Sequence, residues 1–152
     1  MQATWILVAD RVRARLFCAS ADGRSLIEMQ DFVNPDGRAA GRELTRDARP
    51  RTMESLGNVR HVIEPHTGLE DRSAERFARE LNEVLEQGLG NRRYERLILT
   101  APPHFLGTLQ HALGKQVGAC VVAHLDKDLT TLPKSEIQCR VATIEPQITV
   151  PR

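Results

Sequence analysis

The sequence of 152 residues has few aromatic residues and no excess of charge of either sign. Aromatic residues make up 4% of the chain, and none lies between Asn34 and Pro65, which disfavours a surface that stacks single-stranded bases there. The formal net charge is +1. A strongly basic DNA-binding or RNA-binding domain is therefore excluded, and any RNA contact must come from local clusters of charge.

Cysteines are scarce as well. Cys18, Cys120 and Cys139 are odd in number and have no CxxC spacing, a pattern typical of neither a disulfide framework nor a zinc site. We predict reduced thiols, with no metal and no cofactor.

Long apolar runs are absent. The run Trp5–Ala9 is far too short to span a bilayer, and no basic segment precedes it as in a secretory signal. We therefore expect a cytoplasmic protein without a membrane partner.

Several enzyme motifs are missing too. The sequence contains no GxxxxGKS/T or GxGxxG phosphate loop, no HExxH and no GxSxG, and each absence weakens one enzyme class. The motifs identify no catalytic residue, and we favour a protein that is not an enzyme.

The first third of the chain is typical of three short strands. Trp5–Ala9 is continuously apolar, as in a strand buried on both faces. A second strand alternates around Leu16 and Phe17, the pair Asp22-Gly23 favours a turn, and Ser25–Val33 is the third strand. These features predict an antiparallel meander.

The next segment, residues 34–66, is rich in proline and glycine and shows no sustained period, which predicts a long irregular loop. A helix then follows, because apolar residues recur at helical spacing from Ala74 to Leu85. The spacing from Thr67 to Glu70 matches a capping box at its start, and Asp71 is an alternative cap.

The second half of the chain alternates between strands and helices. Tyr94–Ala101 is a predicted strand, a helix begins at Pro102 or Pro103, Val117–Leu125 is a strand, and a short helix begins at Pro133. We predict one α/β domain over residues 1–142, with a loose tail at 143–152. Its five-stranded mixed sheet combines the meander with a β-α-β crossover, and the first strand lies at the centre.

Two groups of side chains are candidates for chemistry. Arginine binds phosphate oxygens in pairs, and arginines are frequent in the loop, although carboxylates are interleaved with them. We take as phosphate-binding candidates Arg49, Arg51, Arg60 and His61. The second group precedes the helix and consists of Glu64, His66, Gly68, Glu70 and Asp71. With His61 and Asp10 it offers an acid–base or metal site, or merely exposed loop residues.

Five segments together resemble a bacterial family described as host attachment proteins: "WILVADRVRARLF", "LTRDARPRTMES", "RHVIEPHT…ERFARELNEVL", "YERLILTAPPHFLGTLQHALGKQV" and "DKDLTTLPKSEI". The resemblance runs from about Trp5 to Ile137, and its most specific pieces are "APPHFLG" and "KDLTTL". Where relatives read "DRPGR", this chain has "DARPR" at 47–51.

That family is similar to the middle domain of archaeal and eukaryotic peptide-chain release factors. The resemblance implies an RNase H-like sheet of the kind seen in translation-machinery components. In those factors a Gly-Gly-Gln loop promotes ester hydrolysis. Here Gly68 is retained, but Leu69 and Glu70 stand where a second glycine and the glutamine would be, so the release-factor chemistry does not carry over.

Four functions stay open at this point. The first is a non-catalytic release-factor-like protein that binds RNA or the ribosome, and the second is a host attachment or interaction protein. The third is a hydrolase of RNA or an ester that uses His61, Glu64, His66 and Asp71. The fourth is a homo-oligomeric scaffold that associates through the edge strand at Ser25–Val33 or through its tail.

Overall fold

The structure is a computed structural model that describes residues 3–20, 25–36 and 59–148, of which 59–67 and 145–148 are described by their backbone alone. The strands are β1 (Thr4–Ala9), β2 (Arg13–Ala19), β3 (Leu26–Val33), β4 (Arg96–Thr100) and β5 (Val121–Leu125). The helices are α2 (Val59–Gly90), α3 (Pro103–Ala112), α4 (Lys115–Cys120) and α5 (Lys134–Ile148).

The five strands form one mixed sheet with the order β3-β2-β1-β4-β5. β1 pairs antiparallel with β2 and parallel with β4, and β5 is parallel to β4. The predicted sheet is thus confirmed, including the central place of the first strand. All six residues of β1 are buried, because helices cover both faces of the sheet.

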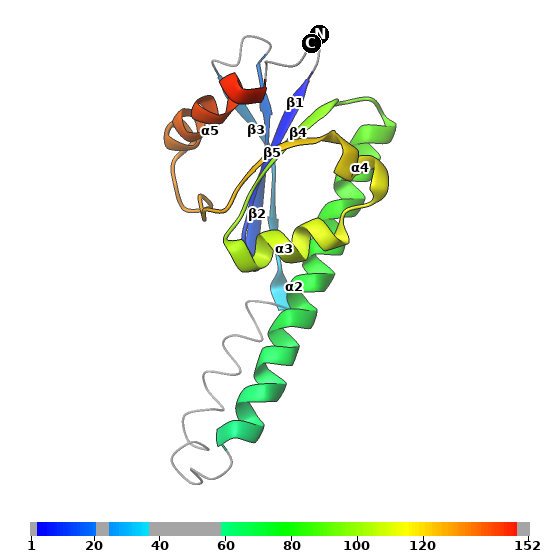
Figure 1. The fold of residues 1–152 in the computed structure, drawn as a ribbon, viewed down its shortest axis with the longest axis vertical. Helices are drawn as coiled ribbons and strands as arrows, with labels where there is room; N and C mark the ends of the chain where they lie inside the picture. Colours follow the sequence, from blue (N-terminus) through cyan, green and yellow to red (C-terminus); the bar gives the residue numbers. More distant parts are fainter. Residues whose placement is uncertain (1–2, 21–24, 37–58, 149–152) are drawn as a thin grey trace.

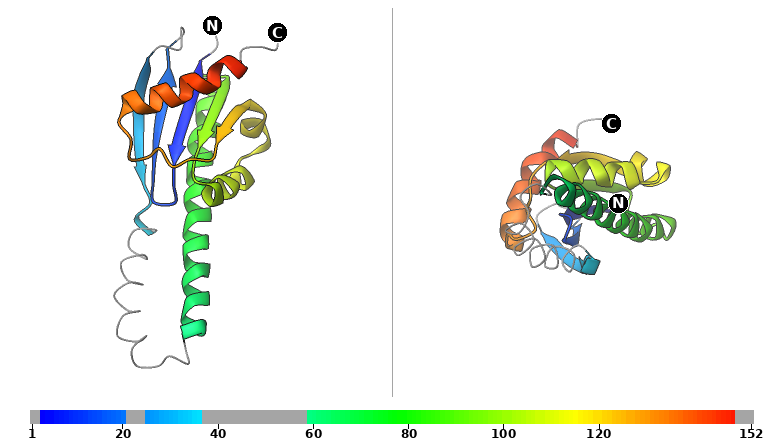
Figure 2. Two further views of the ribbon diagram at one scale, coloured as in Figure 1. Left: turned by 60° about the vertical axis from the view of Figure 1, so that its left-hand side comes forward. Right: turned by 90° about the horizontal axis from the view of Figure 1, so that it is seen from below.

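The two faces carry separate apolar layers. α2, α3 and α4 cover the face that bears Trp5, Leu7 and Leu97. α5 crosses the opposite face, where Ile137 and Val141 pack beside Ile6 and Phe17 (Figure 2). This pattern follows from the period of two along each strand, which turns alternate side chains to opposite faces.

Helix α2 is much longer than predicted. It begins at Val59 and has 32 residues, which corresponds to about 48 Å at 1.5 Å per residue. The expected loop 34–66 therefore ends in helix from Val59 onward, and the expected cap at Thr67–Glu70 or Asp71 is wrong. Residues 37–58 lie outside the described residues.

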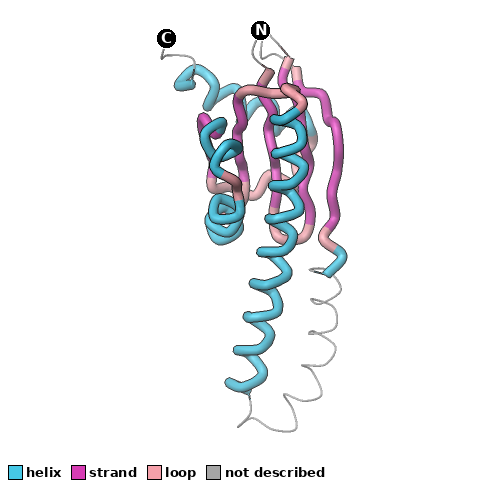
Figure 3. The backbone as a smooth tube through the Cα atoms, turned by 90° about the vertical axis from the view of Figure 1, so that its right-hand side faces the viewer, coloured by secondary structure: helices cyan, strands magenta, loops and turns pink. Residues whose placement is uncertain are grey.

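The error has a physical cause. Pro65 belongs to the proline- and glycine-rich segment that predicted a loop, since proline removes a helical hydrogen bond. The first buried side chain described in α2 is Ser73, and the apolar stripe that the sequence predicts begins at Ala74. Periodicity marks only the part of α2 that packs on the sheet, and the preceding part extends past the sheet as an arm (Figures 1 and 3).

Stacked aromatic rings hold the other end of α2. The rings of Trp5 and Tyr94 lie 4.4 Å apart between centroids, and the Tyr94 hydroxyl donates a 2.7 Å hydrogen bond to the carbonyl of Leu85. Burial raises the pKa of Tyr94. Gly88 lies against both rings, so the absence of a side chain there lets the helix approach the sheet.

Two other boundaries differ from the prediction. Residues 115–120 form helix α4, so only the second half of the expected strand Val117–Leu125 is β5. Val117 is buried in the layer beneath α2, a place that suits a short helix as well as a strand. The last helix runs to Ile148, so residues 143–148 belong to α5 and not to a loose tail.

Strand β3 is an edge of the sheet, as predicted. Ile27 and Val33 expose 60% and 56% of their surface. The register of β2 and β3 shifts between Leu16 and Phe17, and Glu28 and Asp31 place charge along the strand. Bulges and charges of this kind discourage edge-to-edge pairing, and self-association through β3 stays a prediction.

Candidate functional site

A cleft of about 410 Å³ lies at the carboxyl ends of the parallel strands β1 and β4. Ligands of open α/β sheets commonly bind at this edge. The strand ends form the floor of the cleft, and α2, the start of α3 and the loop after β5 form its walls. The lining residues are Asp10, Arg11, Val12, Glu70, Asp71, Ala74, Pro102, His104, Phe105 and Asp128.

Asp10 is fixed by the turn between β1 and β2. One oxygen, Oδ1, accepts hydrogen bonds of 2.8 Å from the backbone amides of both Val12 and Arg13. The other oxygen, Oδ2, lies 3.2 Å from the hydroxyl of Thr130. The carboxylate therefore has a single orientation, with one oxygen committed to the turn.

Thr130 lies between two carboxylates. It is fully buried, and its hydroxyl is 2.6 Å from Asp128 Oδ1, which also accepts a 3.0 Å bond from the Thr130 amide. A hydroxyl has one proton to donate, and the shorter contact assigns it to Asp128. Asp10 Oδ2 thus keeps capacity to accept a hydrogen bond from another group.

A second hydroxyl at this end of the sheet has no hydrogen-bond partner among the described residues. Thr100 is the last residue of β4 and is fully buried, and its Oγ1 makes no hydrogen bond within the described part of the chain. By the period of two, its side chain shares a face with Ile98, and it pairs with Val8, two residues before Asp10. A buried polar atom without a partner costs about 1–3 kcal/mol.

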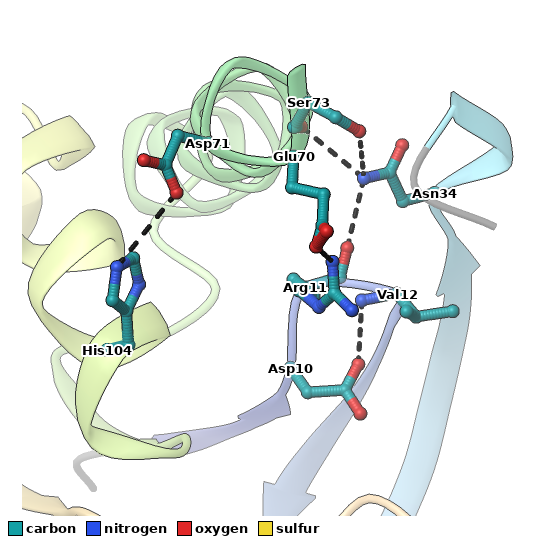
Figure 4. A network of polar contacts seen from close by, with 8 residues as sticks. All are labelled: Asp10, Arg11, Val12, Asn34, Glu70, Asp71, Ser73 and His104. Atoms are coloured by element: carbon teal, nitrogen blue, oxygen red, sulfur yellow. Dashed lines mark hydrogen bonds and ion pairs between the residues drawn. The ribbon is translucent and has the colours of Figure 1, made fainter. Parts of the chain in front are cut away.

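Helix α2 supplies the opposite wall through Glu70 and Asp71 (Figure 4). Glu70 accepts a 2.7 Å hydrogen bond from Arg11 Nη1. Asp71 Oδ1 lies 3.9 Å from His104 Nε2, whose side chain is 80% exposed. The first pair neutralises one carboxylate, whereas the second is a loose contact.

The family model for "Protein required for attachment to host cells" matches residues 5–141. The chain belongs to this family. No curated protein matches it. Among solved structures, the archaeal translation termination factor aRF1 is similar over 95% of this chain, with 10% identity and a TM-score of 0.47, and the chain spans 39% of that factor's length.

The two most specific family pieces both reach the cleft. "APPHFLG" supplies Pro102, His104 and Phe105, and "KDLTTL" supplies Asp128 together with Thr130. Sequence reasoning identified these pieces by their resemblance but left Arg11, His104 and Asp128 out of the candidate site. The signal that could have found them was their position just after predicted strands.

The predicted candidates lie in the cleft, on the arm or outside the described residues. Glu70 and Asp71 line the cleft, and the Gly68 carbonyl accepts a hydrogen bond of 3.3 Å from Arg72 Nε. Arg60, His61, Glu64 and His66 lie on the arm, where the backbone alone is described, and Arg49 and Arg51 lie outside the described residues.

The predicted loop at residues 61–71 is wrong, because these residues are helical. His61 precedes Asp71 by ten residues, which is about 15 Å along a helix axis. That distance exceeds the reach of one acid–base pair. The helix thus separates His61 from Asp71, two residues that the hydrolase hypothesis combined.

Neither cleft nor body shows a metal centre or a membrane span in the part of the chain that the structure describes. No three His, Cys, Asp or Glu side chains there are close enough together to hold a metal ion. None of the described helices has both the length and the apolar character needed to cross a bilayer.

Proposed function

We propose that this protein is a non-catalytic RNA-binding protein that contacts RNA phosphates with arginines of the arm of α2 and of the segment that precedes it in the sequence. The observation that carries the proposal is the extension of α2 past the sheet (Figure 1). Fourteen residues, 59–72, precede the first buried side chain described in the helix, which is about 21 Å of helix. A helical backbone that extends past the sheet offers a large partner a place to bind.

The charge of the sequence around the arm supports a phosphate partner. Residues 37–67 contain six arginines, four carboxylates and two histidines, and no lysine. This segment is therefore more basic than the whole chain, whose formal net charge is +1. Arginine suits phosphate because its planar group donates two parallel hydrogen bonds.

The cleft, by contrast, does not suit RNA. Four carboxylates line it, against one arginine and one histidine. Such a surface repels phosphates, so the RNA contact belongs on the arm. Ribosomal RNA is a candidate partner, and cosedimentation of the protein with ribosomes at low salt tests it.

The experiment compares two triple variants in binding to an oligoribonucleotide. Arg49→Ala, Arg51→Ala and Arg60→Ala together remove three candidate phosphate contacts. Lys115→Ala, Lys134→Ala and Arg140→Ala remove equal charge from exposed positions on α4 and α5. We expect the first variant to weaken binding by about tenfold or more and the second by about twofold at most. Equal losses would mean that only net charge matters.

The family description suggests attachment to host cells as a second candidate. An accessible arm would serve a protein receptor as well as RNA. Cell fractionation and an attachment assay with and without the protein distinguish the two. Attachment requires the protein at the cell surface, whereas RNA binding requires it inside the cell.

The hydrolase hypothesis keeps one test. It required Asp71 with His61, Glu64 and His66, and the described contact of Asp71 is instead the loose one with His104. If Asp71→Asn and His104→Ala abolished hydrolysis of RNA or an ester by the purified protein, the non-catalytic assignment would be overturned.

A further inference from the structure

We propose that the cleft binds an aliphatic ammonium group, as carried by a diamine or by a lysine side chain. This inference is independent of the RNA proposal, because it rests on the cleft and not on the arm. The cleft volume of about 410 Å³ is within the range of small-molecule sites.

The charges that line the cleft favour a cation. The described lining holds the carboxylates of Asp10, Glu70, Asp71 and Asp128 and the guanidinium of Arg11, which gives a formal charge of −3 when histidine is counted as neutral. The whole chain is nearly neutral at +1, so this negative charge is concentrated in the cleft. Arg11 is already paired with Glu70, and among the described residues no lysine or arginine side chain forms an ion pair with Asp10, Asp71 or Asp128.

The hydrogen-bonding atoms favour a donor ligand. Among the described residues, the hydrogen-bond contact of Asp10 Oδ2 is the 3.2 Å one with Thr130, whose proton goes to Asp128. An ammonium group has three donors and no acceptor, and so complements a site rich in acceptors.

The arrangement of apolar side chains favours an aliphatic stem. Ala74 and Phe105 line the cleft together with Val12 and Pro102. Carboxylates stand on both sides, Asp10 and Asp128 at the strand ends and Asp71 on α2. A diamine would place one ammonium group at each wall and its methylene groups on the apolar surface between them.

A bare divalent cation fits less well. Metal ions of this class need several oxygens converging at one point, and among the described residues no three such side chains come together. The carboxylates of the cleft are instead distributed over two walls. An extended organic cation uses that separation.

Thermal unfolding with added probes tests the proposal at equal concentration and ionic strength. The probes are putrescine, the lysine mimic N-acetyl-lysine amide, the neutral isostere 1,4-butanediol, and Mg²⁺. We expect one of the two amines to raise the melting temperature, and neither butanediol nor Mg²⁺ to do so. The amine with the larger effect identifies the source of the ammonium group.

Three charge-neutralising variants then localise the site. Asp71→Asn should not disturb folding. Asp128→Asn and Asp10→Asn keep a carbonyl oxygen that can accept hydrogen bonds from the turn amides. Each should weaken amine binding by about tenfold or more. Glu75→Gln, an exposed change of equal charge on the same helix, should leave binding unchanged. No shift with either amine, an equal shift with Mg²⁺, or an equal loss in Glu75→Gln would overturn the proposal.

Discussion

The side-chain amide nitrogen of Asn34, Nδ2, lies 3.0 Å from the hydroxyl oxygen of Ser73, although 39 positions separate the two residues in the chain. The same nitrogen donates toward the carbonyl of Arg11 at 3.0 Å and toward that of Ser73 at 3.3 Å. Asn34 follows β3, Ser73 lies in α2, and Arg11 lies in the turn after β1 (Figure 4). One buried amide thus joins three segments where the arm meets the sheet.

Loss of this amide should loosen the base of the arm. Asn34→Ala removes the donor shared by the Arg11 carbonyl, the Ser73 carbonyl and the Ser73 hydroxyl, and we expect a loss of about 1–3 kcal/mol in the free energy of unfolding. Urea unfolding measures it. Ser73→Ala removes one of the three acceptors and should cost less than Asn34→Ala, and the reverse order would show that Asn34 does not hold the junction.

Gly88 tests the contact between α2 and the aromatic pair. An added Cβ would overlap the Trp5 ring, and it would lie 3.3 Å from Tyr94. We expect Gly88→Ala to destabilise the fold by about 1–3 kcal/mol through overpacking. Gly90→Ala is the matched control, because no atom lies within 4 Å of its Cβ. The control should be neutral or stabilising by up to about 1 kcal/mol.

Glu28 and Asp31 should affect the pH dependence of stability with opposite sign. A hydrogen bond from Arg15 lowers the pKa of Glu28 to about 2, so its stabilisation is complete above the usual range and is lost as pH falls toward 2. The pKa of Asp31 is raised, mainly by its hydrogen bond with Glu28, so its ionisation opposes folding and this penalty disappears as pH falls.

We therefore expect Glu28→Gln to destabilise the protein at pH 7, by less than about 1 kcal/mol for such an accessible pair. Asp31→Asn should stabilise it at pH 7. Both effects should shrink toward pH 3, and urea unfolding at the two pH values measures them. Changes of the same sign at pH 7 would contradict the assigned pairing.

The sheet could be predicted from sequence because its strands are marked by local patterns. The continuous apolar run at Trp5–Ala9 predicted a strand covered on both faces, and it is the central strand. Phe77 and Leu81 predicted the packed half of α2 for the same reason. These elements could be predicted because their buried side chains produce an apolar pattern in the sequence.

The arm and the cleft have weaker patterns in the sequence. Before Ser73 the sequence carries Pro65 and Gly68 and shows no sustained apolar period, so the first part of α2 could not be distinguished from a loop. The Asp10–Thr130 contact joins residues 120 positions apart, and no spacing rule predicts such a pair. The family resemblance pointed to the right segments, but the fold was needed to bring them together.

The salt dependence of RNA binding tests the central claim most directly. If Arg49, Arg51 and Arg60 contact phosphates, the logarithm of the association constant should fall with the logarithm of salt concentration. Each phosphate contact on single-stranded RNA contributes a slope of about −0.7. The triple alanine variant should therefore have a slope shallower by about 2, with the Lys115/Lys134/Arg140 control unchanged. The same slope in the arm variant and the wild-type protein would contradict the account.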